Sequence, residues 1–328
     1  MTTSETQPDG FVELTQPYKH ELFVHCYRML GSLHEAEDLV QETYLRAWRG
    51  FGDFEGRSSL RTWLYTIATR ACLNALASKS RRVLPVGLGP ANQEPHDNLR
   101  PALAEDVWLQ PLPDSILRAA VDPAEIAVVR SRTRLAMIAA LHSLSARERA
   151  AVILRDVLQW RAAEVAEALD TSAASVNSSL LRARARIKAA EPREDEMVEP
   201  DSADSRAVLD RYVTAFQDAD IDSLVSMLVE DVVIEMPPLP SWFAGVESVG
   251  RFFASRCLYA HQWRMIPTIA NGQPAVAAYM RDADGVYAAH SIQVLTLTRT
   301  GIARIMAFRS PLHFAYFDLP GHLTQEDC

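Results

Sequence analysis

The chain lacks the cysteine clusters and long apolar runs that mark several classes of protein. Its 328 residues include four cysteines, which are scattered and form no CxxC or Cys/His cluster. Neither a zinc site nor a disulfide framework is therefore expected, and a reducing compartment fits best. No run of 18 apolar residues occurs, and the N-terminus MTTSETQPDG is polar and acidic. We expect a cytoplasmic protein without membrane contact, metal ion or cofactor.

The chain also lacks an excess of positive charge, since its formal net charge is −9. This acidity is confined to one part: residues 1–193 carry 24 Lys and Arg against 23 Asp and Glu, whereas the remainder carries 9 against 19. Residues 46–82 form a basic patch in which the only acids are Asp53 and Glu55. The length predicts two or three domains. A nucleic-acid-binding N-terminal part and a separate acidic C-terminal part are indicated.

Residues 160–188 predict a helix, a tight turn and a second helix. Asp170, Thr171 and Ser172 are turn and N-cap residues between the two helices. This pattern is typical of a helix-turn-helix, and the alternative is an ordinary helix pair with a solvated basic face. The buried stripe of the second helix would be Val176, Leu180, Ala183 and Ile187. Its polar side, suited to base edges and phosphates, would be Asn177, Ser178, Ser179, Arg182, Arg184, Arg186 and Lys188.

Two successive helices are expected near the N-terminus, at residues 18–30 and 32–48. Gly31 separates them, and Ser32 with Glu35 forms a capping-box pattern. The second helix is apolar on one side, and its opposite arc suggests a protein contact, although a solvated face with one exposed leucine is common. That arc consists of Asp38, Gln41, Glu42 and Leu45.

A glycine-rich loop at residues 50–59 and a helix at residues 60–77 follow. The loop contains Phe51, Phe54 and Arg57. Aromatic rings beside cations are suited to stacking on unpaired bases and binding phosphates. Trp63, in the following helix, could take part in this surface, and the alternative is that it belongs to the hydrophobic core. The outward stripe of the helix is expected to be Thr62, Tyr65, Thr66 and Thr69, flanked by Arg61, Trp63 and Arg70.

Three strings in this order carry a resemblance to a known family: AEDLVQETYLRAW, then F-x-G-x-x-S-L-x-x-WLY-x-IA, then a helix-turn-helix ending in SLLRARARI. Over roughly residues 15–190 the chain resembles the sigma-70 family, and within it the extracytoplasmic-function group of bacterial sigma factors. The resemblance implies two all-α domains, region 2 at residues 10–80 and region 4 at residues 123–192. It also implies binding to core RNA polymerase and promoter DNA.

The resemblance assigns a partner to each predicted surface. The arc of Asp38, Gln41, Glu42 and Leu45 would contact the clamp helices of the polymerase β′ subunit, and the β flap is a second implied contact. The helix from Ser175 to Arg186 would face the minus-35 element; Asn177 and Ser179 stand where Lys or Arg is common, which predicts weaker phosphate attraction there. Melted minus-10 DNA would be held by Phe54, Arg57, Ser58, Arg61, Trp63, Tyr65, Thr66, Arg70 and Asn74.

Residues 81–122 are rich in Pro and Gly and predict a flexible or extended connector. The string WLQPLPD within it resembles that of a sigma factor subgroup with a C-terminal extension. Trp108, Leu109 and Leu112 are candidates for docking on a partner. In the family, this linker threads through the RNA-exit path and active cleft of the polymerase.

An acidic hinge at residues 193–204 precedes a C-terminal part at residues 205–322. Helices around residues 208–216 and 224–229 come first, and strands follow at 232–236, 265–270, 275–281, 286–298 and 302–308, with a helix at 246–257. This α+β order resembles the cone-shaped SnoaL-like fold, some members of which are cyclases or isomerases with a pocket Asp or His. His290, Asp231, Tyr279 and Trp242 are available here, but no acid and base pair up, so no catalytic residue is assigned. An unidentified small molecule is a further candidate partner.

The sequence therefore predicts a multidomain sigma factor, not an enzyme, whose acidic C-terminal domain regulates it in cis, because opposite charges favour contact with the basic surfaces. One alternative is a ligand-responsive helix-turn-helix regulator that recruits no polymerase; the face of Asp38 and Leu45 argues against it. A second is an enzyme of the polyketide-cyclase type with a DNA-binding tail, which would require turnover dependent on His290 or Asp231.

Overall fold

The structure, a computed structural model, describes residues 10–77, 82–92, 99–120, 125–190, 198–256 and 261–323. The chain forms two compact units. The first comprises residues 1–81, 116–126 and 140–190, and the second comprises residues 82–115, 127–139 and 191–328. Predicted region 2 and most of predicted region 4 thus share one unit, whereas residues 127–139 of region 4 and most of the predicted linker belong with the C-terminal part.

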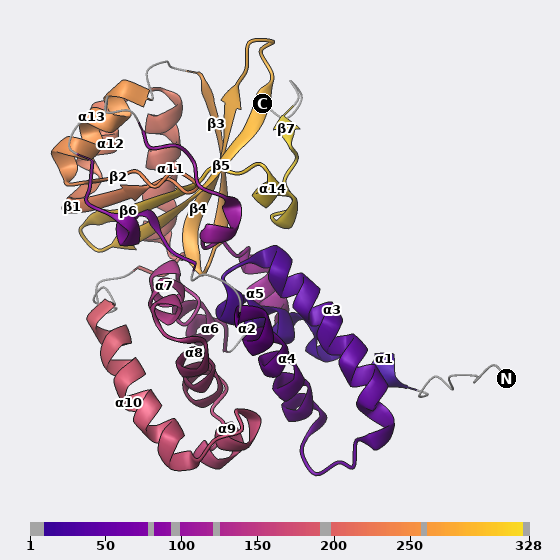
Figure 1. The fold of residues 1–328 in the computed structure, drawn as a ribbon. Coiled ribbons are helices and arrows are strands. Elements are labelled where there is room, and N and C mark those ends of the chain that lie inside the picture. The colour runs from indigo at the N-terminus through magenta and orange to yellow at the C-terminus, as the bar shows by residue number, and fades with distance from the viewer. Residues whose placement is uncertain are drawn as a thin grey trace. The chain divides into compact units, whose positions relative to one another are not determined.

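The first unit begins with the predicted helical block. Gly31 adopts a left-handed φ of 72° and ends one helix, and the Ser32 hydroxyl accepts the Glu35 N–H at 3.4 Å at the start of the next. Two short 3₁₀ turns, η1 (Gln16–Tyr18) and η2 (Phe51–Asp53), join these helices to their neighbours. The helices, seen in Figure 1, are α1 (Phe11–Thr15), α2 (Lys19–Leu30), α3 (Leu33–Gly50) and α4 (Leu60–Leu76).

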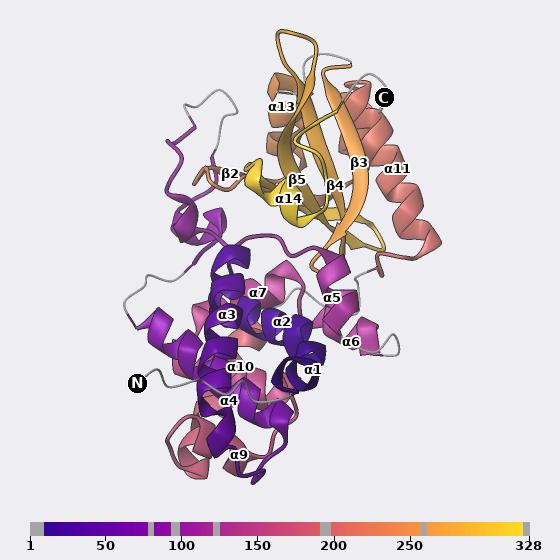
Figure 2. The ribbon, with the colours of Figure 1, turned by 90° about the vertical axis from the view of Figure 1, so that its right-hand side faces the viewer.

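The same unit contains the predicted helix-turn-helix. Helix α8 (Ala146–Val152) starts with a capping box between Ser145 and Glu148 and continues as a π-helical turn, Ile153–Val157. Helices α9 (Ala162–Ala168) and α10 (Ala173–Ala190) follow and pack against each other (Figure 2). The predicted stripe is confirmed, since the buried residues of α10 include Val176, Leu180, Ala183 and Ile187.

The described residues between these two helical blocks form two 3₁₀ turns and three helices. The two 3₁₀ turns are η3 (Pro85–Leu88) and η4 (Glu105–Val107), and the three helices are α5 (Asp114–Ala120), α6 (Ile126–Ser131) and α7 (Leu135–Ser143).

The second unit is built on a mixed sheet in the order β2-β1-β6-β5-β4-β3, in which β1 and β6 are parallel and the other neighbours antiparallel. The short strand β7 (His322–Leu323) pairs with β5. The other strands are β1 (Leu228–Glu235), β2 (Trp242–Ala244), β3 (Trp263–Ala270), β4 (Gln273–Arg281), β5 (Tyr287–Thr298) and β6 (Gly301–Phe308). The sequence placed Leu228 and Val229 in a helix; this was wrong, because the helix ends at Ser226 and both residues begin β1.

Helices cover both faces of this sheet. Helices α11 (Ala203–Gln217) and α13 (Val246–Arg256) lie on one face, together with α12 (Ile221–Ser226), and α14 (Leu312–Tyr316) lies on the other (Figure 1). The core between the sheet and the first three helices includes Tyr212, Phe216, Phe253 and Trp263. This is the α+β, SnoaL-like arrangement that the sequence predicts.

Candidate nucleic-acid interface

The predicted polymerase-binding arc lies on an exposed side of α3. Asp38 and Gln41 are exposed, Glu42 is half-buried, and Leu45 is 57% exposed. Glu42 accepts a hydrogen bond from Arg46 one turn later at 2.5 Å, which is an ordinary surface ion pair. The structure therefore brings the four residues to one accessible face, with an apolar side chain among polar ones.

An aromatic cluster forms where the loop before α4 was predicted to hold bases. The ring centroid of Trp63 lies 4.9 Å from that of Phe54 and 6.4 Å from that of Phe51. Trp63 and Phe54 are half-buried, while Arg57 and Ser58 are exposed beside them. Trp63 thus packs on aromatic neighbours, as the core alternative predicts, and part of its side chain stays accessible.

The outward stripe predicted for α4 is only partly correct. Thr62 and Thr66 are half-buried and Asn74 is exposed, but Tyr65 and Thr69 are fully buried. The Tyr65 hydroxyl donates to Glu21 Oε2 at 3.2 Å, and burial raises the pKa of this phenol. Local helical spacing could not reveal Glu21, which belongs to another helix.

Glu21 also organises Arg61, a second residue predicted for minus-10 contact. The guanidinium Nε and Nη2 donate to the two carboxylate oxygens at 2.7–3.0 Å, and the guanidinium carbon lies 4.9 Å from the ring centroid of Tyr65. Arg61 is half-buried. Its side chain is thus held in one orientation, with part of its charge already neutralised.

Within the first unit, α4 contacts the helix-turn-helix. Arg70, predicted to touch minus-10 DNA, is exposed and donates to Asp170 at 3.0 Å and to the carbonyl of Ala168 at 3.3 Å. On the neighbouring helix α8, the buried Arg149 donates to the carbonyl of Met29. Regions 2 and 4 are therefore joined in part through Arg70, a side chain that the sequence assigned to minus-10 DNA.

The turn between α9 and α10 has the predicted capping chemistry. Asp170 adopts a positive φ of 50°, a conformation that aspartate tolerates better than most residues. The Ser172 hydroxyl then accepts the N–H of Ser175 at 3.2 Å. Beyond it Ser175, Asn177 and Ser178 are exposed and Ser179 is half-buried.

The arginines of α10 are paired with acids of their own region. Arg184 donates to both oxygens of Asp156 at 2.5 and 3.0 Å, and this bond raises the pKa of its guanidinium. Arg186 lies 3.2 Å from Glu148, and Arg182 lies 4.0 Å from the same carboxylate. All three arginines are more than half exposed, so water screens these pairs.

Sequence reasoning missed two features of this helix. The acid partners of the arginines precede α9, too far along the chain for a helical pattern to indicate them. Leu181 was also missed, although it is 75% exposed on the same helix as the predicted DNA contacts. Leu181 does not belong to the predicted buried stripe of α10, and this could have identified it from the sequence as an exposed apolar residue.

The linker prediction was wrong in its most specific part. Trp108, Leu109 and Leu112 are buried within the second unit rather than exposed for a partner. Leu112 exchanges two hydrogen bonds with Asn271, because its N–H donates to Oδ1 at 2.8 Å and its carbonyl accepts the Asn271 N–H at 2.7 Å. The second unit thus supplies hydrogen-bond partners to the backbone of this segment and also covers its apolar side chains.

Further contacts run along the linker on both sides of these apolar residues. The Trp242 indole N–H donates to the carbonyl of Gly89 at 2.9 Å. The N–H of Val86 donates to Glu235, a fully buried carboxylate that also receives a hydrogen bond from Arg304 at 2.8 Å. Instead of a free connector, the described residues between 82 and 115 form a layer on the C-terminal domain.

The C-terminal domain encloses a cavity of about 200 Å³. Of the four residues that sequence analysis considered for chemistry, His290 lines it, and the other three lie elsewhere. Asp231 is exposed on β1, Tyr279 is buried and donates to the carbonyl of Pro320, and Trp242 contacts the linker. No carboxylate lines the cavity in the part of the chain that the structure describes.

No group of three or more His, Cys, Asp or Glu side chains among the described residues is placed to hold a metal ion. No helix within the described ranges is both long and apolar enough to cross a membrane.

Comparisons with known proteins agree with the arrangement of the two helical regions. The sequence matches the family descriptions "Sigma-70 region 2" over residues 14–82 and "Sigma-70, region 4" over residues 134–187. The ECF RNA polymerase sigma factor SigG of Mycobacterium tuberculosis is 45% identical over 94% of this chain and 84% of its own length. The probable sigma factor SigI of the same organism is 28% identical over 84% of this chain and 86% of its length. The crystal structure of M. tuberculosis SigJ has the same fold, with a TM-score of 0.64 at 22% identity, covering 94% of this chain and 100% of that chain.

Proposed function

The chain belongs to the extracytoplasmic-function sigma factors of the sigma-70 family, and from this membership we propose a role for each of its surfaces. As a sigma factor it binds core RNA polymerase and promoter DNA. The finer assignment is that the exposed face of α3 binds the β′ clamp helices and that a second contact reaches the β flap. The observation that carries it is Leu45, which is 57% exposed among Asp38, Gln41 and Glu42.

The DNA contacts are divided between α4 and α10. The aromatic cluster of Phe54 and Trp63 stacks with unpaired minus-10 bases, and the residues around it hold the backbone. These are Arg57, Ser58, Arg61, Thr66, Arg70 and Asn74; the buried Tyr65 bonds to Glu21, which also holds Arg61, and does not itself reach DNA. The minus-35 element is met by Ser175, Asn177, Ser178, Ser179, Arg182, Arg184 and Arg186. Because Arg70 is bonded to Asp170, promoter binding requires this contact between the two regions to open.

The C-terminal domain restrains the protein in cis by holding the linker. Residues 82–92 and 99–115 would have to leave the domain to follow the polymerase cleft, yet Trp108, Leu109 and Leu112 are buried against it. Re-exposing such apolar side chains costs about 1.5–3 kcal/mol each. The linker is thus the element through which residues 205–322 act on regions 2 and 4, at residues 10–80 and 123–192.

Run-off transcription with core polymerase and a pool of genomic promoter fragments tests the sigma assignment. Leu45→Arg and Asp38→Arg should abolish both initiation and binding to core polymerase, because each places a cation on the binding face. Leu14→Arg is the matched control, since Leu14 is 53% exposed on α1 outside this face. Full initiation by the two α3 variants would refute the assignment of the face.

A second set of variants tests the restraint. Asn271→Ala removes the side-chain bonds to Leu112 and to the carbonyl of Thr133, so transcription should increase. Asp231→Ala, at an exposed position of the same domain, should leave transcription unchanged. Unchanged transcription by Asn271→Ala, in a protein whose linker amides exchange faster, would rule out control through the linker.

A further inference from the structure

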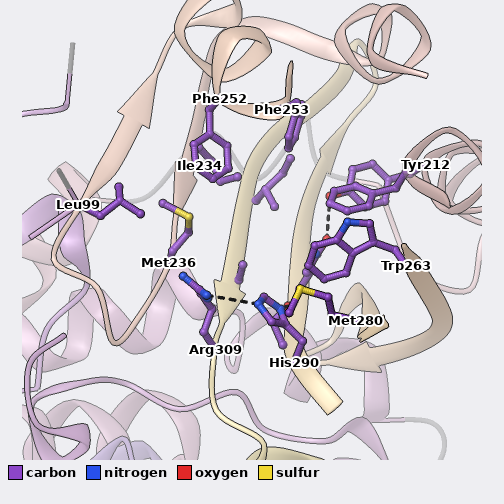
Figure 3. Close-up of a pocket in the computed structure, with 15 residues that line it drawn as sticks. Leu99, Tyr212, Ile234, Met236, Phe252, Phe253, Trp263, Met280, His290 and Arg309 are labelled. Carbon is purple, nitrogen blue, oxygen red and sulfur yellow. Dashed lines mark hydrogen bonds between the residues drawn. The ribbon is translucent and has the colours of Figure 1, made fainter. Parts of the chain in front are cut away.

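The cavity of the C-terminal domain has an apolar body with polar groups on part of its wall. Figure 3 shows Phe252 and Phe253 at one end and His290 at the other. Much of the remaining wall is aromatic or aliphatic and includes Phe216, Ile234, Met236, Met280 and Ile305. An apolar cavity of about 150 Å³ takes up benzene. This cavity, of about 200 Å³, therefore has room for a molecule of one or two rings.

Strand β5 brings two adjacent polar side chains to the cavity through a β-bulge. In the pairing with β4, Ala278 stands opposite Ser291 and Tyr279 opposite Ala289, which leaves His290 as the extra residue. A bulge re-aims the side chains beside it. His290 and Ser291 consequently both line the cavity, although successive residues of a regular strand point to opposite faces.

Gln293, two residues further along β5, presents an unused hydrogen-bond donor to the cavity. It lines the wall and is 5% exposed, and its Oε1 accepts from the Tyr212 hydroxyl at 2.8 Å. The amide nitrogen Nε2 carries two hydrogens and has no acceptor among the described residues. An oxygen atom that enters the cavity and accepts from Nε2 therefore gains a hydrogen bond without displacing one within the protein.

A second donor belongs to the same wall. The indole of Trp263 lines the cavity and packs edge-on against His290, with ring centroids 4.9 Å apart. Its N–H is buried and has no hydrogen-bond partner in the part of the chain that the structure describes. Buried donors in native proteins are nearly always satisfied. Two donors without acceptors on one wall therefore indicate a site for an acceptor.

The buried part of the wall is uncharged, which selects the charge of the ligand. Ser291, Gln293 and Trp263 are at most 7% exposed and carry no charge. Arg309 also lines the cavity, but it is exposed and lies at the end where His290 stands (Figure 3). A charged molecule buried among neutral groups loses hydration that those groups restore only in part. The wall therefore favours an uncharged ligand whose oxygen accepts from neutral donors.

Another part of the wall comes from the linker. Leu99 lines the cavity and packs against the domain core. The next residue, Arg100, donates its N–H to the Ser241 hydroxyl at 3.1 Å. The N–H of Leu103 donates to the carbonyl of Pro238 at 3.0 Å. The docked linker thus completes the wall that a ligand would touch.

We propose that this cavity binds an uncharged molecule of one or two rings through a carbonyl oxygen that accepts from the Gln293 amide, and that the bound molecule strengthens the docking of the linker. A ligand that contacts Leu99 binds the docked state more tightly than the released one, and by thermodynamic linkage it shifts the population toward the docked state. The consequence for transcription rests on the proposed role of the linker, because only then does the ligand reduce initiation.

Calorimetric titration of the full chain with three compounds of similar shape tests the site. 1-Indanone, which is neutral and has a carbonyl, should bind about fivefold more tightly than indane, which has the same rings without an acceptor, because one net hydrogen bond is gained. It should also bind more tightly than indane-1-carboxylate, which carries a negative charge. Absence of indanone binding, equal affinity for indane, or tighter binding of the carboxylate overturns the site.

Variants of the wall identify the donor. Gln293→Leu should remove the preference for 1-indanone over indane, while its binding of indane shows that the variant is folded. Gln262→Leu, the same substitution at a half-buried residue outside the cavity, should keep the preference. Ala307→Leu fills part of the cavity and should weaken both compounds. A preference retained by Gln293→Leu, or undiminished binding by Ala307→Leu, contradicts the proposal.

Hydrogen exchange tests the link to the linker without polymerase. At saturating 1-indanone the amides of Arg100 and Leu103 should exchange more slowly than in the free protein, and the effect should disappear in Leu99→Ala. Unchanged exchange while calorimetry shows saturation overturns the coupling. If Asn271→Ala leaves transcription unchanged, the regulatory role of the linker fails, whereas the binding and exchange results are decided independently of it.

Discussion

Arg130 forms a buried, two-point ion pair with Asp114, the last residue of the WLQPLPD string. Its Nη2 lies 2.6 Å and its Nε 3.1 Å from the two carboxylate oxygens, and both side chains are about 95% buried. A third residue, Asp201, accepts from Arg130 Nη1 at 2.7 Å and is half-exposed. One guanidinium thus ties the end of the WLQPLPD string to the segment that enters α11.

Loss of this arginine should destabilise the second unit strongly. Arg130→Met removes the two charge-assisted hydrogen bonds that Arg130 donates to the buried Asp114 carboxylate, and it should lower the free energy of unfolding by about 3–5 kcal/mol. Asp114→Asn should cost less, because Asp201 still neutralises Arg130. Denaturant unfolding measures both, with Arg206→Met, an exposed arginine of α11, as the control. A larger loss in Asp114→Asn than in Arg130→Met would contradict this account.

Releasing an arginine of α10 should strengthen DNA binding. Asp156→Asn removes the carboxylate that holds Arg184, so the cation becomes available for a phosphate. Promoter affinity should rise several-fold at low salt, and the slope of log K against log salt should steepen by up to about 0.9. Glu167→Gln makes the same charge change at an exposed position of α9 and serves as the control in filter-binding titrations. Equal effects of the two variants would show that only net charge matters.

Leu181 should read a thymine methyl group in the minus-35 element, because apolar side chains recognise thymine in the major groove. Leu181→Ala should cost about 1 kcal/mol of binding. Replacing each thymine of the duplex by uracil should weaken wild-type binding at one position and leave Leu181→Ala unaffected there. If Leu181→Ala loses as much binding affinity as wild type at every thymine replaced by uracil, Leu181 makes no contact with a thymine methyl group.

Buried histidines should make stability fall with acidification. Burial lowers the pKa of His25 from 6.5 to about 3, helped by nearby Arg28 and Arg61, and the pKa values of His290 and His313 to about 4. The unfolded chain binds these protons near pH 6.5, so stability is complete above that pH and declines as pH falls toward 4. Each histidine contributes a slope of about 1.4 kcal/mol per pH unit.

His25→Gln tests this slope and keeps a polar partner for Thr69. The unfolding free energy of this variant, measured between pH 7 and pH 5, should decline less steeply than that of wild type. The difference in slope should equal the contribution of one histidine. His34→Gln, at an exposed position, should decline as wild type does. A wild-type slope in His25→Gln would mean that His25 titrates normally in the folded protein.

Local patterns predicted the secondary structure of this chain well. Gly31 and Ser32 mark a helix boundary through backbone freedom and side-chain capping, and the stripe from Val176 to Ile187 follows from a 3.6-residue period. Alternation and turn signals predicted β1, β3, β4, β5 and β6 to within a few residues, whereas the short strands β2 and β7 were not predicted. Leu228 was misassigned because a short apolar run fits a helix and a strand equally well.

What the sequence by itself determined is therefore the order of elements, the charge division between the two parts and the motifs that indicate a sigma factor. Only the tertiary structure decided that Tyr65 turns inward to Glu21, that Arg184 meets Asp156, and that Trp108 lies on the C-terminal domain rather than ready for a partner. Helical and strand periods fix which face of an element is apolar, but they carry no information about which distant segment covers that face. Which residues form ion pairs, and where the linker is buried, depend on which distant segment covers each face.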